Sequence, residues 1–189
     1  MAEAPLVAVL AAGRATRFGG AKLEAPCAGR PLGRWALDAV EEAGLKPGLI
    51  VTGPEGVSFA EGWTKLINPQ PEAGLASSLA LAAQVALAGG ARSLLVLLAD
   101  MPLVAAAYLR ELAATPPPAA TRQADGRAGV PALLNHALMK KASGLTGDRG
   151  AAPLLRRARL LGPPAGSLFD VDTPADLAEV ETILLAQPR

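Results

Sequence analysis

Uninterrupted runs of aliphatic residues constrain the fold of this chain more than any other feature of its sequence. Residues Leu6–Leu10 and Ser93–Leu98 are almost entirely Leu, Val and Ala, with no polar residue at every second position. A strand that lacks this alternation is covered on both faces, which is typical of a parallel sheet between two layers of helices. Helix-forming segments at 32–43 and 75–88 follow the pattern of crossover connections. The sequence therefore predicts a three-layer α/β fold with a mainly parallel sheet.

The other segments continue this alternation and then break it. Short apolar runs predict further strands at 49–51, 65–67 and 168–171, and helical spacing predicts helices at 105–114, 135–141 and 174–185. Between them, Asp125-Gly126 separates apolar segments at 119–123 and 129–134, and an Asp-Gly pair is a strong hairpin signal. We therefore expect a small antiparallel ribbon after the parallel strands. Arg156–Arg159 is expected at the solvated C-terminal end of a helix.

Length and composition narrow the class of protein. The 189 residues, of which 51% are hydrophobic, suit a single domain over 1–189, and the net charge of +1 argues against nucleic-acid binding. The one cysteine, Cys27, excludes an internal disulfide and a cysteine zinc site, and its expected role is packing. The start of the chain lacks the basic region of a secretion signal, and the aliphatic runs are too short to cross a bilayer. We expect a cytoplasmic protein that binds neither nucleic acid nor membrane.

The segment after the first strand is rich in glycine and cationic residues. It reads Leu10-Ala-Ala-Gly-Arg-Ala-Thr-Arg-Phe-Gly-Gly-Ala-Lys22. In open parallel sheets, ligands bind beyond the carboxyl ends of strands, and small residues let backbone N–H groups approach an anion. Arg14, Arg17 and Lys22 would supply the charge that a polyphosphate requires. The segment is neither a dinucleotide fingerprint nor a Walker loop, so phosphate binding and a solvated basic loop are both compatible with it.

Acidic residues also follow two of the predicted strands. Asp100 comes directly after the buried run at 93–98, and Asp170 and Asp172 lie where the predicted strand at 168–171 meets the last helix. A carboxylate at this edge of the sheet can hold Mg²⁺, which takes one or two carboxylates together with waters and substrate phosphates. The alternatives are a turn or capping role for Asp100 and a helix-capping role for Asp172.

Several motifs, taken in order, resemble those of the MobA-like nucleotidyltransferases. The loop at 10–22 is similar to the family's L-A-A-G-x-S-x-R-M-G-x-x-K, and Leu98-Ala-Asp-Met-Pro102 is similar to its L-A-D-Q-P. Four more segments resemble family motifs: Asn68 with Gly74–Leu79, Gly129-Val-Pro131, Gly147-Asp-Arg-Gly-Ala151 and Asp170-Val-Asp-Thr-Pro174. These matches span nearly the whole chain, and the sequence looks most like the molybdenum cofactor cytidylyltransferase branch of the family.

The resemblance implies the Rossmann-like fold of nucleotide-diphospho-sugar transferases and a role for individual residues. Lys22 and Arg17 would hold the triphosphate and, with Asp100, form the catalytic set. Asp100 would be the principal Mg²⁺ ligand, and Asp172 is a second candidate. The nucleotide site implied by the resemblance consists of Leu10, Ala11, Ala12, Gly13, Arg17, Lys22, Asn68, Gly74 and Ser78.

The activity implied by the resemblance is transfer of CMP from CTP to a molybdopterin-type molybdenum cofactor, by Mg²⁺-assisted in-line attack on the α-phosphate with release of pyrophosphate. Ala12 matches the cytidylyl branch, because the guanylyl branch typically has glycine there. The implied partners are CTP, the molybdopterin-type cofactor and, for delivery, a molybdoenzyme or its maturation chaperone.

Three alternatives to this activity stay open. They are a GTP-using cofactor guanylyltransferase, nucleotidyl transfer to another small phosphorylated acceptor such as a sugar or polyol phosphate, and a non-catalytic molybdenum cofactor carrier. Ala152 leaves room for another acceptor, since the related motif has an arginine at this position. Arg149 or Arg156 would then have to bind the acceptor phosphate.

Overall fold

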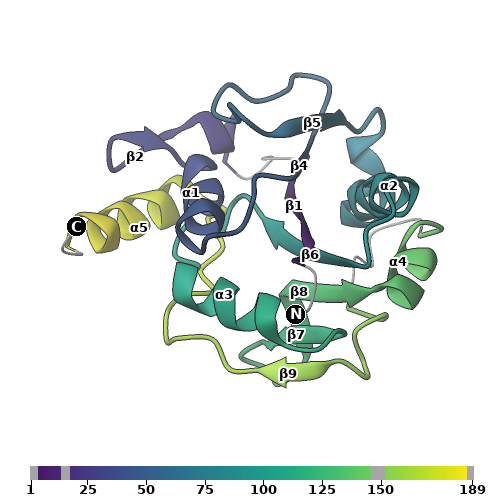
Figure 1. Ribbon diagram of the computed structural model, residues 1–189. Coiled ribbons are helices and arrows are strands. Elements are labelled where there is room, and N and C mark those ends of the chain that lie inside the picture. The colour runs from purple at the N-terminus through teal and green to yellow at the C-terminus, as the bar shows by residue number, and fades with distance from the viewer. Residues whose placement is uncertain (1–3, 14–17, 146–151, 187–189) are drawn as a thin grey trace.

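The computed structural model describes residues 4–13, 18–145 and 152–186, and its centre is a seven-stranded sheet (Figure 1). The strands of this sheet lie in the order β5-β4-β1-β6-β8-β7-β9. Their bounds are β1 Leu6–Ala11, β4 Leu49–Thr52, β5 Thr64–Ile67, β6 Ser93–Leu98, β7 Ala119–Arg122, β8 Ala128–Asn135 and β9 Arg159–Leu161. A separate two-stranded ribbon consists of β2 Pro26–Cys27 and β3 Arg30–Pro31.

The sheet is mainly parallel, as the aliphatic runs predict. β1 pairs in parallel with β4 on one side and with β6 on the other, and β4 pairs in parallel with β5. β8 is antiparallel to both β6 and β7, while β9 runs parallel to β7. The predicted hairpin around Asp125-Gly126 is therefore the β7–β8 pair, and it is part of the main sheet.

Helices cover both faces of the sheet and complete the three layers (Figure 1). α1 and α3 pack on one face through Leu37 and Leu109, and α2 and α4 pack on the other through Leu79 and Met139. The bounds are α1 Arg34–Glu42, α2 Leu75–Ala88, α3 Ala106–Ala114 and α4 His136–Ala142, with 3₁₀ turns at η1 Lys22–Glu24 and η2 Pro71–Ala73. Both cores consist mainly of Ala, Leu and Val, whose burial drives folding. Within the described ranges, no helix is long and apolar enough to cross a membrane.

The last helix, α5 Pro174–Ala186, lies beside the β2–β3 ribbon (Figure 1). Val180 of this helix and Cys27 of the ribbon belong to one small core and are both fully buried. The hydroxyl of Thr173 accepts a hydrogen bond from the N–H of Asp176 at 3.2 Å, and the Asp176 carboxylate accepts one from the N–H of Thr173 at 2.7 Å. This reciprocal capping box explains why the helix begins at Pro174.

The structure corrects two expectations near the C-terminus. Residues 168–171 do not form a strand, and Val171 packs with Cys27 and Val180 in the small core at α5. Instead, the N–H of Val171 donates to the backbone carbonyl of Asp100 at 3.0 Å, so this segment passes the end of β6. The arginine-rich segment is also not the end of a helix: Arg156 lies in a turn and Arg159 begins β9.

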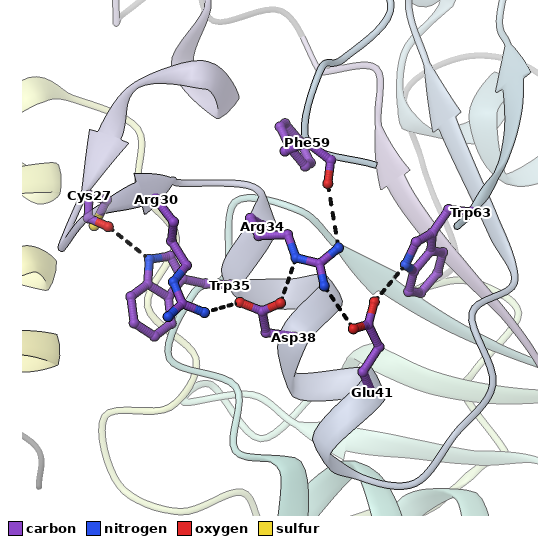
Figure 2. A network of polar contacts seen from close by, with 8 residues as sticks. All are labelled: Cys27, Arg30, Arg34, Trp35, Asp38, Glu41, Phe59 and Trp63. Atoms are coloured by element: carbon purple, nitrogen blue, oxygen red, sulfur yellow. Dashed lines mark hydrogen bonds and ion pairs between the residues drawn. The ribbon is translucent and has the colours of Figure 1, made fainter. Parts of the chain in front are cut away.

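A network of ion pairs and hydrogen bonds fixes the β2–β3 ribbon to α1 (Figure 2). Asp38 of α1 accepts hydrogen bonds from Arg30 of β3 and from Arg34, the latter at 2.5 Å. The Arg30 guanidinium lies 4.4 Å from the ring centroid of Trp35, and the indole N–H of Trp35 donates to the carbonyl of Cys27 at 3.0 Å. Because the ribbon follows η1 directly, this network also holds η1 in place.

Candidate active site

A cavity of about 260 Å³ lies at the carboxyl ends of β1 and β6, where the sequence predicts a ligand site. Its walls also include η1 and the first turn of α2. Most residues of the predicted site line this cavity: Leu10, Ala11, Ala12, Gly13, Lys22, Gly74, Ser78 and Asp100. Arg14, Arg17 and Arg149 lie outside the described residues, together with the rest of the segment at 146–151.

The local sequence explains why these segments meet at one cavity. Ala11 and Ala12 are small and nearly buried, so the loop after β1 can present its backbone to a ligand. Gly74 has φ +85° and ψ −177°, a conformation that residues with a side chain rarely adopt, and it turns the chain from η2 into α2. A second cavity, of about 360 Å³, is lined by the same loop and by Gly53–Val57 after β4, and it shares Lys22 with the first. The two cavities together can hold a ligand larger than either.

Lys22 connects three distant segments of the chain at the edge of the first cavity. Its Nζ lies 2.8 Å from Oδ2 of Asp100 and 3.4 Å from Oδ1 of Asp172. The Lys22 side chain is 9% exposed, against 26% for Asp100 and 50% for Asp172. A nearly buried ammonium group requires anionic partners to offset its lost hydration, and the two carboxylates supply them. Lys22 and Asp100, which the sequence motifs assign to one site, are therefore in direct contact.

Negative charge is concentrated around this lysine. Asp170 is exposed as a residue, yet partial loss of hydration at its carboxyl group, followed by the charges of Asp100 and Asp172, raises its pKa to about 6. The charge of Lys22 acts in the opposite direction but does not outweigh these effects. This end of the sheet therefore favours an additional cation.

Asp100 and Asp172 offer oxygen ligands of the kind that Mg²⁺ takes. Their carboxylate oxygens converge on one point, since a single atom, Nζ of Lys22, contacts both. Mg²⁺ prefers oxygen ligands and usually takes only one or two carboxylates from a protein. In the part of the chain that the structure describes, no group of three or more His, Cys, Asp or Glu side chains could hold a metal ion. An ion at this point would therefore also need ligands from a substrate or from water.

Asn68 lies behind the wall of the cavity and does not line it. The residue is 3% exposed, and its Nδ2 donates to the hydroxyls of Ser77 at 2.8 Å and Ser78 at 3.0 Å. Its Oδ1 accepts the N–H of Gln70 at 3.0 Å. These bonds connect the turn at 68–70 to the first turn of α2, so the geometry is that of a positioning residue.

A third cavity, of about 360 Å³, adjoins the first, since Leu98 is part of both walls. It lies between the β7–β8 hairpin, Met101 after β6 and Asp170. Arg127 on the hairpin lines this cavity, and its exposed side chain forms an ion pair with Asp125 at 2.7 Å. Two cavities therefore meet at the end of β6, next to Asp100.

Several residues that shape the site were not predicted from the sequence. Glu24 accepts hydrogen bonds from both the N–H and the hydroxyl of Ser58, each at 2.6 Å, and so connects the loop after β4 to η1. Pro71, Glu72 and Leu75 line the first cavity. The proline-rich turn before the predicted helix at 75–88 is a signal that could have located Pro71 and Glu72. The contact between Glu24 and Ser58 joins residues 34 positions apart and leaves no local signal.

Comparison with known proteins identifies a matching family. Residues 7–161 match the MobA-like NTP transferase domain family. This region contains all strands of the main sheet except the first residue of β1, together with Lys22 and Asp100. Asp172 and α5 lie beyond it.

Individual relatives agree with this match. The purine catabolism protein PucB of Bacillus subtilis is 28% identical over 186 residues, covering 88% of this chain and 91% of PucB. The crystal structure of Rv0371c from Mycobacterium tuberculosis H37Rv has a TM-score of 0.76 at 25% identity and covers 94% of this chain and 98% of its own. Rv0371c is also known in a complex with manganese. A nucleotidyl transferase from Methanothermobacter thermautotroptrophicus, Mth528, has a TM-score of 0.81 at 22% identity over 97% of this chain and 99% of its own. The predicted Rossmann-like nucleotidyltransferase fold is thus confirmed.

Proposed function

Because this chain belongs to the MobA-like NTP transferase domain family and is therefore a nucleotidyltransferase, we propose that it transfers CMP from CTP to a molybdopterin-type molybdenum cofactor and releases pyrophosphate. The main support is the contact between Lys22 and Asp100 at the edge of the cavity lined by the loop after β1. This contact joins a cation suited to phosphate with a carboxylate suited to a divalent metal at one point of the ligand site.

The nucleotide is assigned to the first cavity. Gly74 and Ser78 line its wall at the start of α2, where base and ribose would pack, and the loop from Ala11 to Gly13 would contact them with its backbone. Lys22, together with Arg17, would hold the triphosphate, because cationic donors form strong charge-assisted hydrogen bonds with phosphate oxygens.

Ala12 supports CTP over GTP. It is 9% exposed and lines the first cavity, where its methyl group narrows the space beside the loop compared with the glycine of the guanylyl branch. A pyrimidine needs less space than a purine. The nucleotide preference is therefore assigned to CTP.

The proposed reaction requires positioning and charge neutralisation and no general base. A terminal phosphate oxygen of the acceptor forms a bond to the α-phosphorus of CTP, and the bond from this phosphorus to the oxygen bridging the β-phosphate breaks. The attacking phosphate is already ionised near neutral pH, since its second pKa is about 6. Lys22 and Arg17 would offset the charge that builds on the departing pyrophosphate. Asp100 and Asp172 would hold Mg²⁺, which supplies further neutralisation of phosphate charge.

The acceptor is assigned to the third cavity, which meets the first at Leu98. A neighbouring cavity of about 410 Å³ extends this space, and Arg127 and Arg156 lie along it. These cations suit an acceptor that carries anionic groups. Ala152 lines both cavities at the position where the related motif has arginine, so a sugar or polyol phosphate is the second candidate acceptor.

Pyrophosphate release tests this proposal. The protein is incubated with Mg²⁺, CTP or GTP, and either the molybdopterin-type cofactor or a panel of sugar and polyol phosphates. We expect CTP with the cofactor to give the fastest release, and Asp100→Ala to lower turnover by about 10²–10³-fold, the usual effect of removing an electrostatic group from an active site. Glu179→Ala, an exposed carboxylate on α5, is the matched control and should leave turnover unchanged.

Other outcomes have distinct meanings. Preference for GTP would show that the protein transfers GMP and not CMP. Faster transfer to a sugar phosphate would show that the acceptor is not the molybdopterin-type cofactor. Wild-type turnover by Asp100→Ala would refute the proposed arrangement of the site. A protein that binds the cofactor but releases no pyrophosphate with any nucleotide would act as a carrier.

A further inference from the structure

Lys22 and a divalent metal ion require the same carboxylates. Nζ of Lys22 lies at the point on which Asp100 and Asp172 converge, at 2.8 and 3.4 Å. A metal ion held by these two carboxylates at the short distance that Mg²⁺ demands, about 2.0–2.1 Å, would lie close to this ammonium group. Two cations at such a separation repel each other strongly in a partly buried site. The ammonium group and the ion therefore exclude one another at this point.

We propose that Lys22 is an internal counter-ion that occupies the metal site of the free protein and leaves it only when the triphosphate of a nucleotide provides a new anionic partner. This inference rests on the proposed function, because it uses the same carboxylates as metal ligands and the same lysine as the triphosphate ligand. It adds an order of events: the nucleotide draws Lys22 away, and the ion then takes the place of the ammonium group beside Asp100 and Asp172.

The burial of the three side chains supports this exchange. The Lys22 side chain is 9% exposed, so the ammonium group cannot regain full hydration near its present position and needs an anion wherever it moves. Asp100, at 26%, is partly buried as well and needs a cation from some source. The first cavity, which Lys22 and Asp100 both line, is the space from which a polyanion could provide the alternative partner.

The exchange makes nucleotide and metal binding cooperative. If the nucleotide removes the competing cation, it raises the affinity of the protein for the metal ion. By thermodynamic linkage, the metal ion then raises the affinity for the nucleotide by the same factor. Coupling between two sites is usually about 5- to 150-fold, which is the range expected here.

Mn²⁺ is the probe for the test, since free Mn²⁺ can be measured directly by electron paramagnetic resonance. The dissociation constant of Mn²⁺ is measured for the wild-type protein and for Lys22→Met, which removes the charge but keeps much of the side-chain length. Lys65→Met, at an exposed position of β5, is the matched control for the change in net charge. We expect Lys22→Met to bind Mn²⁺ about 5- to 150-fold more tightly than the wild type without nucleotide, and Lys65→Met to match the wild type.

A second measurement covers the possibility that Lys22→Met does not fold. Wild-type protein is titrated with Mn²⁺ in the presence of a non-hydrolysable CTP analogue, and Asp100→Asn is titrated in parallel to subtract Mn²⁺ bound by the analogue itself. The wild type should show the same tightening of Mn²⁺ binding, and Asp100→Asn should not. The inference is overturned if a folded Lys22→Met binds Mn²⁺ no more tightly than Lys65→Met, or if the analogue fails to tighten Mn²⁺ binding by the wild type.

The result also separates this inference from the proposed function. If Mn²⁺ binds the wild type equally well with and without the analogue and turnover depends on the ion, only the counter-ion role fails. If no protein in the series binds Mn²⁺ and pyrophosphate is still released, Asp100 and Asp172 are not metal ligands. In that case the metal assignment fails together with the inference.

Discussion

Replacing Asn68 with alanine should lower both the stability of the protein and its affinity for the nucleotide. The Asn68 side chain makes three hydrogen bonds from a position that is 3% exposed: to Ser77, to Ser78 and from the N–H of Gln70. A hydrogen bond contributes about 1 kcal/mol net, so Asn68→Ala should lower the free energy of unfolding by about 3 kcal/mol. For a chain of 189 residues, this corresponds to a fall in Tm of roughly 6–12 °C.

Urea unfolding and a thermal melt measure the loss of stability, and calorimetric titration with a CTP analogue measures the effect on the site. Binding of the analogue should weaken although Asn68 does not line the cavity, because its bonds hold the first turn of α2 in place. Asn135→Ala is the matched control. Asn135 caps α4 by accepting the N–H of Leu138 at 2.9 Å, so its loss should lower the unfolding free energy by about 1 kcal/mol and leave nucleotide binding unchanged.

Two results would contradict this reasoning. If Asn68→Ala is no less stable than Asn135→Ala, the three hydrogen bonds contribute little and do not hold the wall of the cavity. If Asn68→Ala keeps its stability but loses nucleotide binding, the amide contacts the ligand directly. The role that the sequence motif implies for Asn68 would then be right and the positioning role wrong.

Two substitutions and one labelling experiment test other parts of the structure. Thr52→Val should raise the free energy of unfolding, measured by urea denaturation, by about 1 kcal/mol. The reason is that the buried Thr52 hydroxyl has no hydrogen-bond partner among the described residues. Gly74→Ala should lower it by about 1–3 kcal/mol and weaken nucleotide binding in a titration, since φ of +85° strains any residue with a side chain. Burial and then the charge of Glu181 raise the pKa of Cys27 from 9.0 to about 11, so a thiolate-directed reagent should label the native protein slowly at pH 7.5 and the urea-unfolded protein quickly. Because the pKa of Cys27 is higher in the folded protein, ionisation of this thiol lowers the free energy of unfolding only as the pH rises from 9.0 to about 11. Equal labelling rates for the folded and the unfolded protein would contradict the burial of Cys27.

The sheet could be predicted where its pattern is local. β1 and β6 are covered on both faces, and this burial leaves a continuous aliphatic run that can be recognised without knowledge of the partner strands. The predicted helix at 75–88 has the same bounds as α2 for a similar reason, since Gly89-Gly90 ends it within the sequence itself.

Two short segments could not be predicted correctly because the interactions that shape them lie elsewhere in the chain. β9 has three residues, too few to show a period, and it forms because β7 offers an unpaired edge. The apolar residues at 168–171 were misinterpreted as a strand for a related reason. Val171 is buried against Cys27 and Val180, so its apolar character reflects packing below α5 and not pairing in the sheet.

In the candidate site, too, some features could be predicted from local sequence and others depend on distant contacts. Gly13, Lys22 and Asp100 follow strand ends, and the topology of a parallel sheet brings such positions together, so their convergence could be predicted. The orientation of Asn68 could not, because sequence does not tell whether a buried amide faces a ligand or its neighbours in the chain. Glu24 and Ser58 were missed because only the folded chain brings the loop after β4 against η1.

The contacts of Lys22 reach across 78 residues to Asp100 and across 150 residues to Asp172. β9, the last strand of the described sheet, ends at Leu161, so a growing chain contains the strands of this sheet before Asp172 is added. A product that ends between these two positions would lack α5, whose Val180 packs with Cys27 of the ribbon, and would hold only one carboxylate of the acidic pair.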